Sequence, residues 1–598
     1  MKHHDRRRPR LALVLGSVWL ATARSWAGCE LKQIEMPVRI VDQRPIATLT
    51  LNGVEAKMLL DSGAFYSFLS PSTAARLNLP LRGLPYGFQI EGYTGSVEAQ
   101  RTRVDKVGLL GADIPNVEFL VGGNELGAGI MGILGRNFLS WADTEYDLAH
   151  GVVQMNFPKG DCDDTVFAYW AGQAPVIVAP LERKGSGDST LRVAVAINGK
   201  RTLAILDTGA PTTALSLRAA RRAGIEERDL TPHGRAGGAG EGRVRSWTAP
   251  VAMFELAGEK ISNNRLEIND TDSLGEGLLL GLDYFLSHRL YVSREQRKIY
   301  ITWNGGSVFA PLQANSGTFD SQYAALPQEV DRNDADALAR RGAAAVAAGN
   351  FPRALEDLNR ACELAPGVAD YFFARARLHL AMRQSRLALA DLDEALRLEP
   401  ALAEARLRRA WVRTALSDRP GALDELARLD SELPPSSHLR EEMGKLYALF
   451  DQAADALRQF NLWTGSHPKD ARLPQVLNDR CWLRARLNIE LSLALQDCRE
   501  AVDKDDGEAW YLDSLGWTYL RMGDAARAQK AFDSAIKLKA LPFSLYGRAL
   551  ALRKLDDAAG SERDLAAARK LQPKIDDEVR KQGFEFADGL AQAAAPGH

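Results

Sequence analysis

The tetrapeptide Asp61-Ser62-Gly63-Ala64 and its near-copy Asp207-Thr208-Gly209-Ala210 decide the fold of the first half of the chain. Two further landmarks recur at the same offset of 146 residues, Asn52-Gly53 as Asn198-Gly199 and Ile133-Leu134-Gly135 as Leu279-Leu280-Gly281. Three landmarks that share one offset indicate an internal duplication. In each copy the Asn-Gly pair stands between alternating apolar residues, which is the strongest short signal for a β-hairpin. Each tetrapeptide therefore follows the second strand of a hairpin, in a loop where glycine lets two backbones approach closely.

The composition excludes several classes of protein. The chain has 598 residues, which at roughly 150 residues per domain predicts about three to five domains. It is 46% hydrophobic and 25% charged, near the globular average, so a fibrous or largely disordered chain is excluded. A net charge of −2 gives no overall attraction to phosphate, so we expect no nucleic-acid partner. The five Cys and nine His show no metal-ligand spacing and no phosphate loop is present, so we expect no metal and no organic cofactor.

The N-terminus has the layout of a secretory signal peptide over residues 1–27. Residues 2–10 (KHHDRRRPR) are basic, residues 11–23 (LALVLGSVWLATA) are apolar, and residues 25–27 (SWA) suit cleavage after the alanine. Thirteen residues rise only about 20 Å as a helix, which is too short to span a hydrocarbon core. We therefore expect an exported, periplasmic bacterial protein whose mature chain has no membrane span.

Two alternatives to cleavage remain open at this end of the chain. In the first alternative, the apolar run is an uncleaved membrane anchor. In the second, residues 26–29 (WAGC) resemble a bacterial lipobox, with Trp where Leu is usual, and Cys29 carries a lipid anchor. We favour plain cleavage over both.

The duplicated pattern resembles the retropepsin-like aspartic peptidases, which place two such lobes face to face. The resemblance predicts two all-β lobes, over residues 35–157 and 188–305. It implies that Asp61 and Asp207 form a dyad that shares one proton, because two close carboxylates cannot both ionise cheaply. The ionised member would take a proton from a water, and the protonated member would donate to the carbonyl oxygen of the scissile amide. The implied activity is hydrolysis of peptide bonds in a protein or peptide substrate.

The resemblance also assigns roles to the residues beside the dyad. The hydroxyls at the second position of each tetrapeptide, Ser62 and Thr208, would brace the opposite loop. The glycines at the third position would let backbone amides point at the carboxylates. Pepsin-like members commonly have serine at the fourth position, and alanine removes that donor, so the dyad should titrate higher and the pH optimum should be less acidic than that of pepsin. These supporting residues are Ser62, Gly63, Ala64, Thr208, Gly209 and Ala210.

The resemblance further predicts a flap in each copy, a hairpin that closes over the substrate and excludes water. In copy one the candidate is residues 87–96 (GFQIEGYTGS), where Tyr93 would reach over the dyad. In copy two it is residues 234–242 (GRAGGAGEG), which contain no aromatic residue. The cleft is therefore expected to be asymmetric, although both segments are also typical of surface loops without such a role.

The second half of the chain has a helical pattern. Residues 306–334 predict a linker, and from Ala335 the apolar residues follow a helical period. A small alanine, a large apolar residue one turn later and a proline that ends the second helix recur every 34 residues, which resembles the tetratricopeptide repeat. We expect about seven repeats over residues 335–573, followed by a tail over residues 574–598. The recurring positions include Ala354, Ala388, Ala422 and Ala456, and Pro366, Pro400, Pro434 and Pro468.

Such repeats stack into a superhelix whose concave groove commonly binds extended peptides or partner helices. The groove candidates by helix position are Phe373, Arg377, Trp411 and Lys445. A spacer or a self-association module is the alternative, because a fold alone names no ligand.

Export would permit disulfide bonds. Cys29 and Cys162 flank the first lobe, and Cys481 and Cys498 fall at core-facing positions on the two helices of the fifth repeat. The alternative for the second pair is two buried thiols, and Cys362 is expected to be a buried thiol. The sequence alone fixes none of these pairings.

These patterns predict a multidomain protein, with two all-β aspartic protease lobes followed by an all-α tetratricopeptide superhelix. The predicted function is that of an exported aspartic endopeptidase whose repeats recruit a substrate or adaptor protein. The alternative is a catalytically inactive scaffold of the cell envelope, against which the two intact tetrapeptides argue. A third hypothesis is that the lobes cleave only their own chain. We expect the two lobes to pair within one chain, and pairing between chains stays open.

Overall fold

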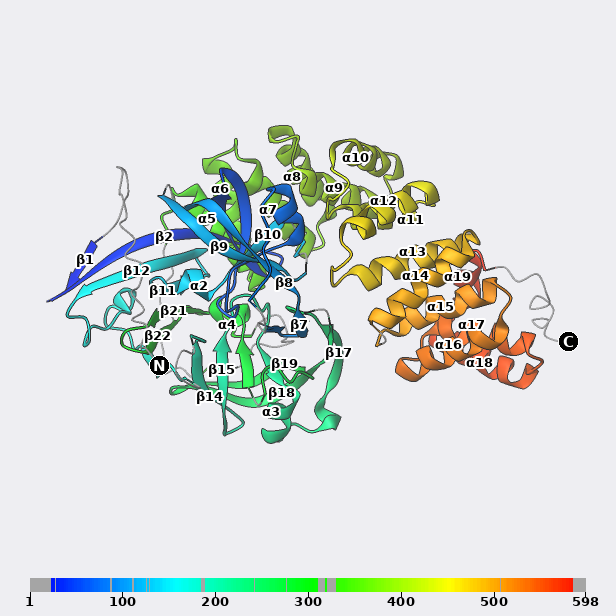
Figure 1. Cartoon of the computed structure of the whole chain (residues 1–598), viewed down its shortest axis with the longest axis horizontal. Coiled ribbons are helices and arrows are strands. Elements are labelled where there is room, and N and C mark those ends of the chain that lie inside the picture. The colour runs from blue at the N-terminus through cyan, green and yellow to red at the C-terminus, as the bar shows by residue number, and fades with distance from the viewer. Residues whose placement is uncertain are drawn as a thin grey trace.

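The structure, a computed structural model, consists of two β-rich lobes followed by an α-helical array, which confirms the predicted fold class (Figure 1). No helix within the described part of the chain is long and apolar enough to cross a membrane. The predicted signal peptide lies almost wholly outside the described residues, and Ala23–Trp26 form strand β1. The described residues are 23–26, 28–85, 89–109, 112–124, 126–127, 129–183, 189–240, 242–275, 277–309, 318–319, 330–505 and 507–584.

The first lobe contains the strands of the first sequence copy and two short helices. Its Asn-Gly turn joins β3 to β4, and Asn52 and Gly53 both have positive φ, as a type I′ hairpin turn requires. The strands are β2 (Cys29–Val41), β3 (Arg44–Leu51), β4 (Val54–Leu60), β5 (Phe68–Leu69), β6 (Ile90–Gly92), β7 (Gly95–Val97), β8 (Ala99–Leu109), β9 (Ala112–Gly122), β10 (Ile130–Leu134), β11 (Asp143–Asp147) and β12 (Val152–Gly160), and the helices are α1 (Pro71–Arg76) and α2 (Arg136–Leu139).

The second lobe repeats this plan. Asn198 and Gly199 again have positive φ between β14 and β15. The strands are β13 (Ile177–Pro180), β14 (Arg192–Ile197), β15 (Lys200–Leu206), β16 (Ala214–Ser216), β17 (Thr231–Ala236), β18 (Val244–Leu256), β19 (Glu259–Asn269), β20 (Gly277–Leu280), β21 (His288–Ser293), β22 (Lys298–Trp303) and β23 (Thr318–Phe319), and the helices are α3 (Leu217–Arg222) and α4 (Leu282–Phe285), with 3₁₀ turns at Tyr169–Ala171 and Glu227–Asp229.

One 13-stranded sheet joins the two lobes of the chain. Strand β11 of the first lobe pairs antiparallel with β21 of the second, with Glu145 opposite Tyr291. A single apolar core continues through both lobes. The lobes therefore pair within one chain.

A disulfide between Cys29 and Cys162 ties the two ends of the first lobe together. Because that bond occupies the Cys29 sulfur, the structure leaves no thiol there for the lipid anchor considered above.

The helical array begins beside the first lobe, where α5 contacts β2, and continues past the second lobe (Figure 1). The four repeating alanines are fully buried, which lets the second helix of each repeat approach the first. Its helices are α5 (Ala335–Ala347), α6 (Phe351–Leu364), α7 (Ala369–Ala381), α8 (Ser385–Leu398), α9 (Ala403–Ala415), α10 (Arg419–Glu432), α11 (Arg440–Leu449), α12 (Ala453–Ser466), α13 (Leu473–Leu487), α14 (Leu491–Lys504), α15 (Ala509–Arg521), α16 (Ala525–Leu538), α17 (Pro542–Lys554), α18 (Ala558–Leu571) and α19 (Ile575–Lys581).

Two boundaries differ from the sequence prediction. Helix α19 lies in the predicted tail, and its Ile575 and Val579 are buried against the last repeat, so it caps the end of the apolar core. Part of the predicted linker, Thr318–Phe319, pairs with β19 as strand β23.

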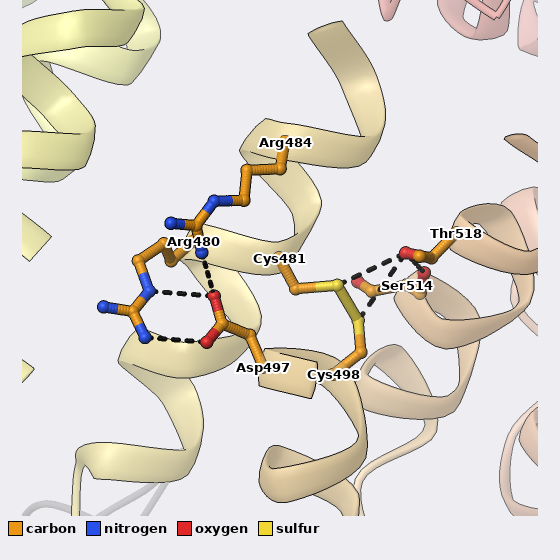
Figure 2. The surroundings of a disulfide bond; sticks show 7 residues. All are labelled: Arg480, Cys481, Arg484, Asp497, Cys498, Ser514 and Thr518. Atoms are coloured by element: carbon orange, nitrogen blue, oxygen red, sulfur yellow. Dashed lines mark hydrogen bonds and ion pairs between the residues drawn. A yellow bond between two sulfur atoms is a disulfide. The ribbon is translucent and has the colours of Figure 1, made fainter. Parts of the chain in front are cut away.

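A second disulfide, between Cys481 on α13 and Cys498 on α14, braces the fifth repeat (Figure 2). Both cysteines are fully buried, and the hydroxyl of Thr518 on α15 lies 3.3 Å from the Cys481 sulfur. Beside them, Asp497 accepts two hydrogen bonds from Arg480, at 2.8 and 2.7 Å, and pairs with Arg484. The covalent bond and the ion pairs therefore join α13 to α14. The remaining cysteine, Cys362, is a buried free thiol, and burial raises its pKa to about 11.

Candidate active site

The two tetrapeptides meet at the interface between the lobes. Each aspartate follows a strand that pairs in parallel with the strand of the downstream motif, β4 with β10 and β15 with β20. The amide of Asp61 donates to the Leu134 carbonyl, and that of Asp207 to the Leu280 carbonyl, both at 3.0 Å. The recurring apolar-apolar-Gly motif therefore fixes where each aspartate leaves its strand.

The two carboxyl groups are in hydrogen-bond contact, and each lies on the glycine of the opposite loop. A Cβ on Gly63 would stand 2.5 Å from Cγ of Asp207, and a Cβ on Gly209 would stand 2.5 Å from Cγ of Asp61. A separation below 3.0 Å is a steric clash, so both positions require glycine for the carboxyl groups to approach. The structure thus brings the predicted dyad together.

Burial raises the pKa of both carboxyl groups. The pKa of Asp61 rises above its ordinary value, whereas that of Asp207 rises well above it, because the adjacent Asp61 charge adds to burial. Backbone amides oppose the rise, from Ala64 to Asp61 Oδ1 at 2.8 Å, and from Gly209 and Ala210 to Asp207 Oδ1 at 3.0 and 3.2 Å. The pair therefore holds one proton to higher pH than a free carboxyl group, with Asp207 as the favoured protonated member.

Ser62 and Thr208 form four buried hydrogen bonds across the lobe interface. The amide of Ser62 donates to the Thr208 hydroxyl, and the amide of Thr208 donates to the Ser62 hydroxyl, both at 3.0 Å. The Ser62 hydroxyl donates to the carbonyl of Leu206, and the Thr208 hydroxyl to that of Leu60, both at 2.8 Å. This reciprocal arrangement fixes the two loops relative to each other.

Sequence reasoning missed Arg136, which lies beside the dyad in the first lobe only. Its side chain is buried, and Nη1 donates to the carbonyl of Gly63 at 2.7 Å. Its charge lowers the pKa of Asp61. The corresponding residue of the second copy is Leu282, so the duplication gave no signal for this arginine. Arg136 thus favours Asp61 as the ionised member.

The predicted flap of copy one is a hairpin, β6–β7, with Tyr93 near its tip. Residues 87 and 88 of that prediction lie outside the described residues. The Tyr93 hydroxyl accepts a hydrogen bond from Asn269 of the second lobe at 2.9 Å, and its carbonyl accepts one from Thr271 at 3.2 Å. Burial raises the pKa of Tyr93. The flap therefore reaches across to the opposite lobe.

The predicted flap of copy two has a different form. Its first residues, 234–236, belong to strand β17 and pair with β18, so they form part of the sheet. The following residues contact the first flap, where the Thr94 amide donates to the Ala239 carbonyl at 3.0 Å and the Gly242 amide to the Thr94 carbonyl at 3.2 Å. The two flaps therefore meet over the cleft.

A cavity of about 1430 Å³ contains the dyad and extends beyond the lobes to the helical array. Of the groove candidates, Phe373 and Arg377 line it, and Arg377 also pairs with Asp42 of the first lobe at 2.6 Å. The other two candidates donate hydrogen bonds within the array, Trp411 to Glu442 and Lys445 to Glu441. Across the described residues, no group of three or more His, Cys, Asp or Glu side chains is arranged to hold a metal ion.

Comparison with known proteins agrees with this architecture. Residues 47–138 and 193–284 match the family described as aspartyl protease, and residues 511–540 match the family described as tetratricopeptide repeat. The chain therefore carries a tandem pair of aspartyl-protease-type domains followed by tetratricopeptide repeats. No curated protein sequence matches it.

Several solved structures are similar to part of the chain. A tetratricopeptide repeat protein from Parabacteroides merdae is 16% identical, with a TM-score of 0.34, over 42% of this chain and 99% of that one. YrrB, a tetratricopeptide protein with an unusual peptide-binding site, is 20% identical, with a TM-score of 0.29, over 32% and 97%. The type IV pilus biogenesis factor PilW is 16% identical, with a TM-score of 0.31, over 34% and 94%.

Proposed function

We propose that the chain is an aspartic endopeptidase whose dyad is Asp61 and Asp207. The observation that carries this proposal is the pair of carboxyl groups in contact across two glycine loops, with a raised pKa on each. Such a pair is suited to general acid–base chemistry, because one member is ionised while the other keeps its proton.

In the proposed reaction a water molecule is held between the two carboxyl groups. The Asp61 carboxylate takes a proton from this water as it attacks the scissile carbonyl carbon, and Asp207 donates its proton to the carbonyl oxygen. The resulting tetrahedral intermediate collapses when the leaving nitrogen receives the proton held by Asp61 and the oxygen returns its proton to Asp207. No covalent enzyme intermediate forms, and the dyad regains its starting state.

The pH dependence of cleavage should follow the Asp207 proton. Burial and the adjacent Asp61 charge raise the pKa of Asp207, so the protonated member persists at higher pH than for an isolated carboxyl group. Activity should decline on the acidic side as Asp61 becomes protonated, and on the alkaline side as the pair loses its shared proton. We expect an optimum less acidic than that of pepsin.

We further propose that the protein is exported to the periplasm and that its repeats bind a protein partner. The basic and apolar N-terminal pattern and the two disulfides support export, because disulfides persist in oxidising compartments. The repeats support a protein partner, since arrays of this kind present extended concave surfaces. A fusion of residues 1–40 to alkaline phosphatase would test export, and the absence of periplasmic phosphatase activity would refute it.

The decisive test is cleavage of unfolded β-casein and of overlapping peptides from its sequence, analysed by mass spectrometry across pH 4–8. We expect the wild type to cut and Asp207→Asn to lose at least a thousandfold in rate. Asp113→Asn, which changes an exposed aspartate of the first lobe, is the matched control and should retain full activity. Equal cleavage by the wild type and Asp207→Asn would refute the dyad. Absence of cleavage by both would favour the scaffold hypothesis.

A further inference from the structure

The cavity around the dyad is bounded on one side by a regular row of residues from the helical array. The row takes the same position from five successive repeats, so its members are spaced by 34 residues. Most of the row lies at the start of a repeat's first helix. Its members are Asp336, Asp370, Glu404, His438 and Arg472.

The opposite wall of this space is the outer face of strands β3, β4 and β10 in the first lobe. Ile46, Leu59 and Ile130 form a small apolar cluster there and line the cavity. Lys57 stands on the same wall, and it lines the same cavity as His438, which lies in the turn before α11, so the two walls face each other across the cavity. We call the space between them the slot.

Ion pairs join the array to the first lobe at the start of the slot. Arg39 of the first lobe pairs with Asp336 at 3.5 Å and also with Asp370. Arg377 pairs with Asp42 at 2.6 Å. These contacts use the charges of the first two repeats to fix the array on the lobe.

The third repeat carries a charged residue that takes no part in the ion pairs between the array and the first lobe. Arg408, on α9, lines the cavity and is half-buried, and it forms no hydrogen bond or ion pair within the described part of the chain. Glu404, one turn earlier on the same helix, is directed instead at the first lobe, where its Oε1 would lie 3.3 Å from a Cβ on Gly129. A half-buried guanidinium that lacks a partner is suited to a carboxylate from another molecule, since such hydrogen bonds are charge-assisted and frequently bidentate.

The occupant of the slot follows from its continuity with the dyad. A polypeptide that presents one amide to the two aspartates continues on both sides of that amide, and one of those sides opens into the slot. Helices that pack side by side lie about 8–10 Å apart, so crossing from α7 to α11 takes about 20 Å. An extended chain covers that distance with about six residues, at about 3.3 Å each.

We propose that the slot is an extended substrate subsite, in which about six residues flanking the scissile bond lie between the first lobe and helices α7, α9 and α11, with an acidic side chain bound to Arg408. The substrate class is therefore an unfolded or extended polypeptide that carries an acidic residue at a distance from the cleavage site. This inference rests on the proposed function, and it makes the repeats a specificity element of the peptidase.

The test compares two sets of peptides from the β-casein sequence, of 8 and 20 residues. The 20-residue peptides that bind the inactive Asp207→Asn protein should bind at least tenfold more tightly than their 8-residue cores, and they should be enriched in Asp and Glu outside the core. In the Asp207→Asn background, Arg408→Glu should remove this tenfold gain. Arg386→Glu, which changes an exposed arginine on α8 outside the cavity, is the matched control and should leave the gain intact.

Cleavage separates this inference from the proposed function. With an otherwise wild-type dyad, Arg408→Glu should raise KM for the long peptides by about tenfold while leaving kcat/KM for the 8-residue peptides unchanged. Equal binding of long and short peptides, or a gain that survives Arg408→Glu, would overturn the subsite. If the long peptides bind through Arg408 and neither set is cut by the wild type, the subsite stands and the endopeptidase proposal fails.

Discussion

Asp505 connects the helical array to the flap region of the second lobe, and its removal should release that region. Asp505 follows α14, and its side chain is only 3% exposed. It pairs with Arg235 at 2.7 Å, and Arg243 stands 3.8 Å from its other oxygen. These two arginines flank the segment that meets the first flap, of which residues 237–240 and 242 are described. The array therefore holds this segment at both of its ends.

The expected effect of Asp505→Ala can be estimated from burial. Removing one partner of a buried ion pair costs about 3–5 kcal/mol, because the other charge stays buried without compensation. The Arg235 side chain is 17% exposed and the Arg243 side chain 34%, so water can reach both, and we take the lower limit of about 3 kcal/mol. At about 1.4 kcal/mol per factor of ten, local opening of this segment should become about 150-fold more frequent.

Amide hydrogen exchange measured by mass spectrometry tests this estimate. Peptides that cover residues 237–250 should exchange about 150-fold faster in Asp505→Ala than in the wild type, while those from α17 and α18 should be unchanged. Asp564→Ala breaks a comparable pair with Arg548 inside the array and is the matched control, which should leave the flap region unaffected. The reasoning is refuted if exchange in residues 237–250 is the same in Asp505→Ala and the wild type, or if Asp564→Ala accelerates it equally.

Two further predictions concern the helical array. Burial raises the pKa of Asp513 to about 7, so the folded state favours the protonated carboxyl; its stabilising contribution is complete below about pH 4 and is lost as the pH rises through about 7. Asp513→Asn should therefore melt at the same temperature as the wild type at pH 4 and at a higher one at pH 8, and an equal melting temperature at pH 8 would contradict this. The disulfide between Cys481 and Cys498 closes a loop with a sequence separation of 17, so replacing both by alanine should lower the free energy of unfolding by about 3 kcal/mol in urea titrations. Cys362→Ala is the control for loss of a thiol, and a comparable loss there would refute the assignment.

The sequence could predict those features of the fold that recur along the chain or depend on neighbouring residues. The offset that relates Asp61 to Asp207 also relates the two hairpin turns, and Asn52 adopts the positive φ that an Asn-Gly hairpin requires. The 34-residue period likewise located the helices, because each repeat needs a small residue where its two helices approach and a large apolar residue one turn later. These signals depend on spacing alone, and spacing is visible in one sequence.

Contacts between distant parts of the chain could not be predicted in this way. Arg39 pairs with Asp370, 331 residues later, and Asp505 with Arg235 of the second lobe, and neither position stands out from its neighbours. The role of Arg136 could not be predicted from the duplication either, since the second copy has Leu282 at the corresponding position. A pairwise contact leaves no mark on periodicity, so the position of the array on the lobes emerges only from the three-dimensional structure.

The two copies have diverged around nearly identical Asp-Ser/Thr-Gly-Ala loops, and the divergence makes the two sides of the cleft different. In a pair of identical lobes the two aspartates would be equivalent, whereas here Arg136 favours Asp61 as the charged member. The two flaps also differ from each other. A Cβ on Gly238 would lie 2.8 Å from the Tyr93 Cβ, so the glycine-rich segment of the second lobe must be small where the first flap crosses it. That segment is also the one held by the array through Asp505, while the slot opens along the first lobe. A substrate chain would therefore meet different surfaces on the two sides of its scissile bond, which fixes the direction in which it can bind.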